Sequence, residues 1–354
     1  MLTADPPSRP LDLLSGRLGL GAQWDIEHGA DSHFEIRHRD WGTPYRPASR
    51  PLQWAGLLHR LESGFRAAGV TRARPLPMRW GRDTELTISA VQALDPLLKD
   101  GKPYVFRRGY LPQPVVRLTG ERDHAGALRE GFLTSFVNIS RIEPISRPAE
   151  FAGILDHWLT LLSGIGLHAR HLTIHGRNAV WQRREVCGLT VHFRHLDLPI
   201  GDIVLLWNAA DPSCMAVDLG SGLERLAWAR TRRPWRELAF GSFTTAGVAT
   251  DVLDAVRTAT LLVGNSIAPA ARGAGGVLRR ILSAVPADAA PLGVSALVRA
   301  SHGFWSLTSP MALPWPEVAF VIECEIHRRD VISTVDTPER YLSEHEVLRK
   351  IGPR

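Results

Sequence analysis

Hydrophobic residues in the first two-thirds of the chain follow two periods, one helical and one typical of strands. Apolar positions 54, 57, 58, 61 and 65 recur at the spacing of a single helix face, and positions 151, 154, 155, 158, 159 and 162 do the same. Short runs rich in β-branched and aromatic residues predict strands. These runs are 33–37, 86–91, 114–118, 131–139, 171–175, 189–193, 203–207 and 216–222. The mixture predicts an α+β fold in which a mostly antiparallel sheet is flanked by helices.

The pattern of hydrophobic residues changes after residue 240. Helical spacing covers 248–264 and 276–285, and an Ala/Gly/Pro-rich link joins these two stretches. The later apolar run 318–326 favours a strand. We therefore expect an N-terminal extension at 1–49, a sheet-containing domain at 50–240 and a smaller, mostly helical domain at 241–354.

Composition narrows the class of protein. The 354 residues carry a formal charge of +6, and only three of the 42 basic residues are lysines. This arginine bias has two readings, a GC-rich genome or recognition of phosphates and carboxylates by the guanidinium fork. The sequence has no apolar run of about 18 residues and no signal-peptide pattern, so it predicts neither a membrane span nor secretion. Three scattered cysteines exclude a disulfide framework and a four-cysteine zinc site, and we expect a cytoplasmic protein.

The segment Val217-Asp-Leu-Gly-Ser-Gly-Leu-Glu-Arg225, followed by a helix, is the most specific in the chain. Glycines let a backbone pass close to a ligand, and a helix N-terminus attracts anions. Arg225 at that position suits a phosphate. The alternative is a plain glycine turn before a helix, with Glu224 favourable in the first turn.

Two further groups of residues suggest binding. Arg117, in an otherwise apolar predicted strand, must meet either a structural carboxylate or a phosphate in a cleft. Asp218, Asn208 and Trp181 together would suit a small zwitterion, with the carboxylate on its ammonium group and the indole as a wall. The fourteen histidines show no zinc-ligand spacing, and strand geometry puts His192 and His195 on opposite faces.

Taken in order, these segments resemble the core of the class II aminoacyl-tRNA synthetases, specifically alanyl-tRNA synthetase. The segment 217–225 is similar to that family's third motif, and Arg117 with its loop and the strand at 132–140 resemble the second. Weaker but colinear similarities lie at 83–89, 180–182, 187–188, 206–208, 255–264 and 276–281.

The resemblance implies ATP-dependent activation of a small amino acid, with alanine first, and Mg²⁺ bound with the nucleotide. Arg117 would bind the α-phosphate, Arg225 the γ-phosphate, and Phe132 or Phe136 the adenine. The implied ATP site also includes Arg122, Gly222 and Glu224. The implied amino-acid site consists of Trp181, Asn208, Ala210, Asp218 and Gly220. No protein side chain is assigned to a metal.

The sequence differs from the family that it resembles at several positions, and these differences determine which function we expect. The length leaves no room for an editing domain, and residues 268–274 replace the asparagine-rich stretch used in acceptor-stem recognition. In the second motif, Thr134 and Glu121 replace a glutamate and a lysine. Ala210, at an expected valine position, would leave a slightly larger side-chain pocket, which shifts selectivity by about 1–3 kcal/mol.

We therefore expect an enzyme that makes an aminoacyl adenylate and passes the acyl group to a non-tRNA acceptor: a small amine, a nucleoside or a carrier. Two alternatives stay open. One is a minimal enzyme that still charges a tRNA, and the other is a non-catalytic RNA-binding protein. None of the three involves a membrane.

Overall fold

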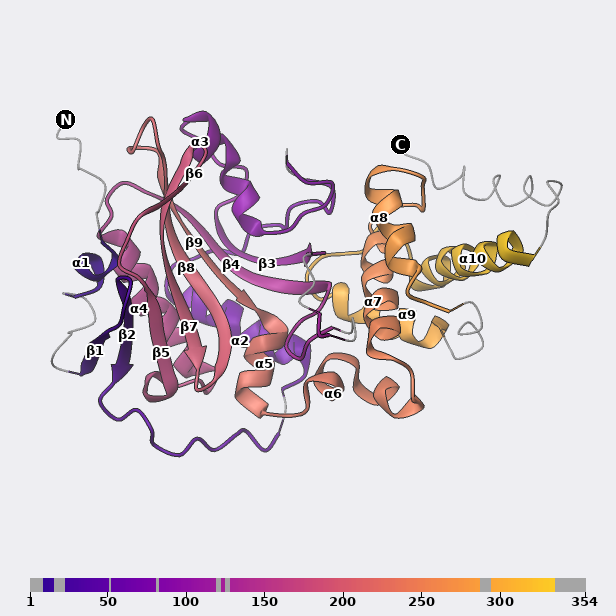
Figure 1. Cartoon of the computed structure of the whole chain (residues 1–354), viewed down its shortest axis with the longest axis horizontal. Helices are drawn as coiled ribbons and strands as arrows, with labels where there is room; N and C mark the ends of the chain where they lie inside the picture. The colour runs from indigo at the N-terminus through magenta and orange to yellow at the C-terminus, as the bar shows by residue number, and fades with distance from the viewer. Residues whose placement is uncertain are drawn as a thin grey trace. The chain divides into compact units, whose positions relative to one another are not determined.

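A nine-stranded antiparallel sheet is the central element of the chain (Figure 1). In the computed structural model, which describes residues 9–15, 23–50, 52–80, 83–118, 122–124, 128–286 and 294–334, its order is β1-β2-β5-β7-β8-β9-β4-β3, with β6 paired to β7. The strands are β1 (Trp24–His28), β2 (His33–His38), β3 (Gly109–Val116), β4 (Ser135–Ile145), β5 (Leu172–Arg177), β6 (Trp181–Arg183), β7 (Val186–His195), β8 (Leu198–Asn208) and β9 (Met215–Gly222). The predicted α+β class, an antiparallel sheet with flanking helices, is confirmed.

The chain forms two compact units. The first comprises Met1–Leu76, Ser89–Gln113 and Val137–Arg233, and the second comprises Pro77–Ile88, Pro114–Phe136 and Pro234–Arg354. The first unit holds most of the sheet with α1 (Pro10–Leu14), α2 (Trp54–Ala67), α3 (Asp95–Asp100), α4 (Glu150–Gly164) and α5 (Leu223–Thr231). The second holds α6 (Trp235–Phe240), α7 (Thr250–Gly264), α8 (Gly273–Leu282), α9 (Val294–Trp305) and α10 (Trp315–Thr334).

Helices α2 and α4 lie behind the sheet in Figure 1 and pack on each other. Both show the predicted apolar face, which is buried at Leu57, Leu61 and Phe65 in α2. A Cβ added at Gly64 would lie 2.8 Å from Leu161 of α4, so this glycine permits the close approach of the two helices. Helix packing against the sheet thus covers one of its two faces.

In the second unit, α7 is the central helix and contacts α8, α9 and α10. Its buried Arg257 donates to the Ser135 carbonyl at 3.0 Å and lies over the rings of Phe304 and Trp305, at 4.6 and 4.7 Å from their centroids. The Trp305 indole in turn donates to the Arg257 carbonyl at 3.1 Å. These hydrogen bonds and ring contacts stabilise the buried guanidinium.

Two predicted strands are wrong. At 86–91, the Ser89 side chain accepts the Val91 N–H and the Gln92 side chain accepts the Ser89 N–H, so a capping box starts a 3₁₀ helix, Ala90–Leu94. At 318–326 the structure has α10, in which Val318, Ile322 and Ile326 are buried at helical spacing. A short apolar run does not by itself distinguish a strand from a buried helix.

Other boundaries also differ from the predictions. The predicted strand 114–118 ends at Val116, so Arg117 follows the strand and is exposed, and β4 begins at Ser135 rather than at 131. The segment predicted as an N-terminal extension contains β1 and β2, and β2 pairs with β5 of the sheet. Glu121 lies outside the described residues. No described helix is long and apolar enough to cross a membrane.

His195 lies on the buried face of the sheet, and the pH dependence of stability can test its burial. Its ring is fully buried against Tyr45, with centroids 4.6 Å apart, and neither ring nitrogen has a hydrogen-bond partner among the described residues. Burial, with Arg232 and His171 nearby, lowers the pKa of His195 to about 3. The neutral ring is therefore favoured in the fold, and its contribution is present above the ordinary histidine pKa and lost as pH falls from that value toward 3.

We expect the wild-type free energy of unfolding to fall by about 2 kcal/mol more than that of His195→Phe between pH 7 and pH 5. Phenylalanine keeps the ring but cannot be protonated. Urea denaturation at each pH measures the difference, and His157→Gln, at an exposed histidine of α4, is the control. Parallel pH curves for wild type and His195→Phe would contradict a buried neutral histidine.

Candidate functional site

The two faces of the sheet differ in chemistry. One face is apolar, with Leu189 and Val191 of β7, Ile203 and Leu205 of β8, and Val217 and Leu219 of β9 all fully buried. Cross-strand register puts the alternate residues together on the other side: Thr190 and His192 of β7, Asp202 and Val204 of β8, Asp218 and Gly220 of β9, and Ser140 and Ile142 of β4. We call this second side the polar face. An antiparallel sheet with one such face can present functional side chains over a rigid scaffold.

Asp218 stands near the middle of the polar face. It pairs with Val204 on one side and with Ile142 on the other, and it is 9% exposed. The next residue on this face, Gly220, carries no side chain, and a Cβ there would meet Asn138 Oδ1 at 3.4 Å and Asp202 Oδ1 at 3.5 Å. A carboxylate held in this way, beside a position with no side chain, suits the ammonium group of a small ligand.

Trp181 lies on the same face, at its edge strand β6. It pairs with Gly188, and a Cβ at Gly188 would lie only 2.4 Å from the indole Cζ2. The indole Nε1–H donates to Thr190 Oγ1 at 2.9 Å, so the ring is fixed at both ends. Thr190 is opposite Val204, and Val204 is opposite Asp218, which places Thr190 two strands, or about 10 Å, from Asp218. The structure thus brings Trp181 and Asp218, two predicted amino-acid-site residues, to one face.

Asn208 follows Asp202 and Val204 in the same alternating set of β8, but its polar atoms are bonded at the end of the strand, and Ala210 lies beyond the strand. The Asn208 side chain is buried; its Oδ1 accepts the N–H groups of Ala210 and Asp211 at 2.9 and 3.0 Å, and its Nδ2 donates to the Leu98 carbonyl at 2.8 Å. Ala210 is exposed in the turn that follows β8. Asn208 therefore builds the β8–β9 turn and ties it to α3, because an Asx side chain readily satisfies nearby backbone groups.

Glu224 and Arg225 are neighbours in the first turn of α5, but their side chains have different environments. Glu224 is 1% exposed, and its carboxylate accepts the Val137 N–H at 3.2 and 3.4 Å, which joins the helix to β4. Arg225 is half-buried, and its aliphatic carbons lie 3.6–3.8 Å from the position of a Cβ on Gly222. Glu224 thus has a structural contact, and Arg225 lies beside Gly222 at the start of the helix.

In the second unit, Arg117 and Phe136 lie together. The Arg117 guanidinium carbon is 5.1 Å from the Phe136 ring centroid, its Nε donates to the Ile88 carbonyl at 2.8 Å, and its backbone N–H donates to the Thr134 carbonyl at 2.8 Å. The side chain is exposed but oriented, which suits a ligand that offers both an anion and a planar ring. Phe132 is half-buried a few residues earlier.

Arg122 has a different environment. It forms an ion pair with Asp251 of α7 at 2.9 Å and, with Asp251, lines a cavity of about 410 Å³. Asp254, also in the lining, is fully enclosed; burial raises the pKa of its carboxyl, although its Oδ1 accepts the Thr134 N–H at 3.0 Å. The structure therefore ties Arg122 to α7.

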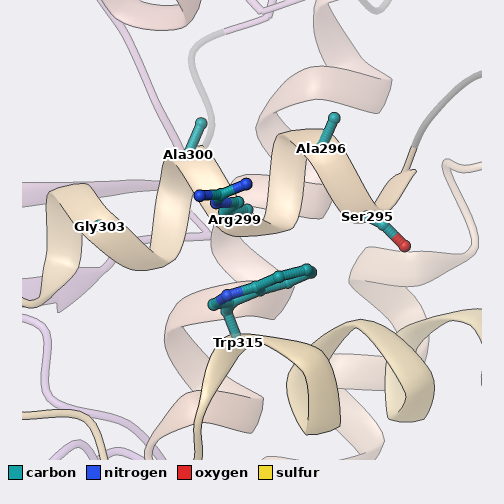
Figure 2. A pocket seen from close by; sticks show the side chains of 6 residues that line it. All are labelled: Ser295, Ala296, Arg299, Ala300, Gly303 and Trp315. Carbon is teal, nitrogen blue, oxygen red and sulfur yellow. The ribbon is translucent and has the colours of Figure 1, made fainter.

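A larger cavity, of about 470 Å³, lies between α9 and the start of α10 (Figure 2). The Arg299 guanidinium carbon is 5.6 Å from the Trp315 ring centroid, and Ala296, Ala300 and Gly303 line the cavity along α9. Neither this cavity nor Arg299 was among the predicted site residues.

Sequence reasoning also passed over the pair of His192 and Asp202. Each occupies the polar face, and they pair across the β7–β8 hairpin. Counting back from the turn would not have found this pair, because a register shift at Phe193 and Arg194 moves the pairing by one residue.

Neither a scan against models of known protein families nor a search of curated proteins finds a match to this chain.

A substitution at Gly188 tests the position of the Trp181 ring. We expect Gly188→Ala to lower the free energy of unfolding by about 1–3 kcal/mol, because the new methyl group must displace the indole and its bond to Thr190. Urea denaturation measures the loss. In the matched control, Gly153→Ala in α4, nothing lies within 4 Å of the new Cβ, and stability should hold or rise. Equal effects of the two substitutions would contradict this placement of Trp181.

Proposed function

We propose that this chain is an aminoacyl-adenylate-forming ligase of the alanyl-tRNA-synthetase type, which activates a small amino acid with ATP. The observation that carries the proposal is the Asp218-to-Arg225 segment: a strand carboxylate on a polar sheet face, two glycines on the same strand and an arginine in the first turn of the next helix. This order resembles the third motif of class II synthetases, and the antiparallel sheet with flanking helices is compatible with their fold.

The amino acid binds over the polar face in this proposal. Asp218 takes its α-ammonium group, because a mostly buried carboxylate gains most from a charged hydrogen-bond donor. Gly220 leaves space beside the carboxylate, and Trp181 closes the edge of the face. Alanine is the first choice, and the reach of the indole limits the size of the side chain that fits.

Arginines hold the nucleotide. Arg117 binds the α-phosphate while Phe136 or Phe132 packs on adenine, and Arg225 binds the γ-phosphate. The amino-acid carboxylate attacks the α-phosphorus, an O–P bond forms, the α–β bridging bond breaks, and pyrophosphate leaves. Bound with the triphosphate, Mg²⁺ supplies further neutralisation of charge, and we assign it no protein ligand. Positioning and charge neutralisation are the main requirements of such a transfer.

The acceptor is a molecule other than a tRNA in the first form of the proposal. The segment 268–274, rich in alanine and glycine, replaces the asparagine-rich stretch that the resemblance associates with the acceptor stem. The charge of +6 favours a second candidate, a minimal enzyme that charges a tRNA, because phosphate contacts dominate affinity for nucleic acids.

Pyrophosphate–ATP exchange that depends on an added amino acid tests the activation step. We expect exchange with alanine, and we expect Asp218→Asn to lower kcat/KM for the amino acid about 100-fold and Arg117→Ala to lower kcat about 100-fold. Arg170→Ala, at an exposed arginine between α4 and β5, is the control and should match wild type.

Absence of exchange with alanine, glycine and serine alike would overturn the proposal. Labelled alanine recovered in acid-precipitable RNA would instead select the tRNA-charging candidate.

A further inference from the structure

A row of side chains crosses the polar face at right angles to the strands. Gly220 of β9 pairs with Asp202 of β8, Asp202 with His192 of β7, His192 with His175 of β5, and His175 with Glu35 of β2. We call these five residues the polar row. It starts at the glycine that follows Asp218 on the same face, so it extends the candidate site sideways across the sheet.

His192 is the most accessible titratable ring of the row. Its side chain is 48% exposed, and its Nδ1 lies 3.9 Å from Asp202 Oδ2. The His175 ring stacks on its other side, with centroids 5.4 Å apart and an angle of 30° between the planes. Nδ1 thus faces the Asp202 carboxylate, and a base at this position would act through Nε2.

His175 supports this arrangement electrostatically. Burial, with Arg194 and His192 nearby, lowers the pKa of His175 to about 4, so this ring is neutral at pH 7. Arg194 is itself ion-paired with Glu35. The His192 ring therefore has a neutral ring on one side and a carboxylate on the other.

The charged and titratable groups that face His192 come from three strands. Asp202 faces it from β8, His175 and Arg177 from β5, and Arg194 from β7 itself. Asp202 is the carboxylate directly opposite, and it is 43% exposed, so it can also attract a cationic amine to the row.

The separation between His192 and the proposed amino-acid site at Asp218 bears on acyl transfer. His192 is two strands, or about 10 Å, from Gly220, and the Asp202 carboxylate lies between them, 3.9 Å from His192 Nδ1. A nucleophile held over Gly220 would lie between the activated amino acid and Nε2 of His192.

We propose that His192 is the general base of acyl transfer, that Asp202 is its positioning residue, and that the acceptor is a primary amine bound along the polar row. This inference rests on the proposed function. The amine nitrogen attacks the carbonyl carbon of the aminoacyl adenylate, and a C–N bond forms. The C–O bond to the phosphate breaks, AMP leaves with the electron pair, and the proton of the nitrogen goes to Nε2 of His192.

The test separates the two steps. Glycinamide is the probe amine. Transfer is the single-turnover formation of alanylglycinamide from labelled alanine and ATP, and activation is pyrophosphate–ATP exchange on the same preparation. Both are measured between pH 6 and pH 9 for wild type, His192→Gln, Asp202→Asn and the exposed control His157→Gln.

We expect His192→Gln to lower the ratio of transfer to exchange about 100-fold. Asp202→Asn should lower the ratio about tenfold and leave the exchange rate at the wild-type value, because it changes only the group that positions the His192 ring. Imidazole added to His192→Ala should restore part of the transfer rate. His157→Gln should match wild type in both assays.

An unchanged ratio in His192→Gln would overturn the assignment and leave the proposed function standing. Exchange by wild type without alanylglycinamide above the enzyme-free rate would overturn the amine acceptor. Loss of exchange in the wild type itself would remove the proposed function and this inference with it.

Discussion

The register of β7, β8 and β9 is the constraint on which the rest of the structure depends. Side chains alternate strictly along a strand, so a slip of one residue would turn Asp218 into the apolar core and bring Val217 and Leu219 to the polar face. The cost of exposing residues that are fully buried, Ile203 and Leu205 among them, prevents that slip. Burial on one face thus fixes the chemistry of the other.

Glycines complete this arrangement where strands or rings come closest. A Cβ on Gly201 would lie 2.2 Å from the carbonyl oxygen of Gly220, so β8 and β9 can keep their pairing at the start of β8 only without a side chain there. Because Gly188 has no side chain, the Trp181 ring can lie directly against it. These contacts lie on strands rather than on loops, so the edge and the floor of the polar face are rigid.

Long periodic segments were predictable from the sequence, and short apolar runs were not. Helices α2, α4 and α7 follow from spacing alone, whereas 318–326 required knowledge of what packs on it from both sides. Asp218 was predicted from a carboxylate inside an apolar strand, and the structure puts it on the polar face. Asn208 was predicted from an amide at a strand end, which can serve a turn as well as a ligand, and its oxygen and nitrogen are bonded to backbone groups of the β8–β9 turn and of α3.

The two histidines of β7 show that the environment of a side chain depends on which face of the sheet it occupies. His192 and His195 are three residues apart in β7, and the sequence correctly put them on opposite faces, but spacing could not say which face was buried. Register answers this: His195 pairs with Leu198 and is fully enclosed, whereas His192 pairs with Asp202 and is half exposed. Burial keeps the first ring neutral and without hydrogen-bond partners among the described residues, and the second has a carboxylate beside one nitrogen and solvent beside the ring. The same residue type is therefore part of the packed core on one face and accessible to solvent on the other.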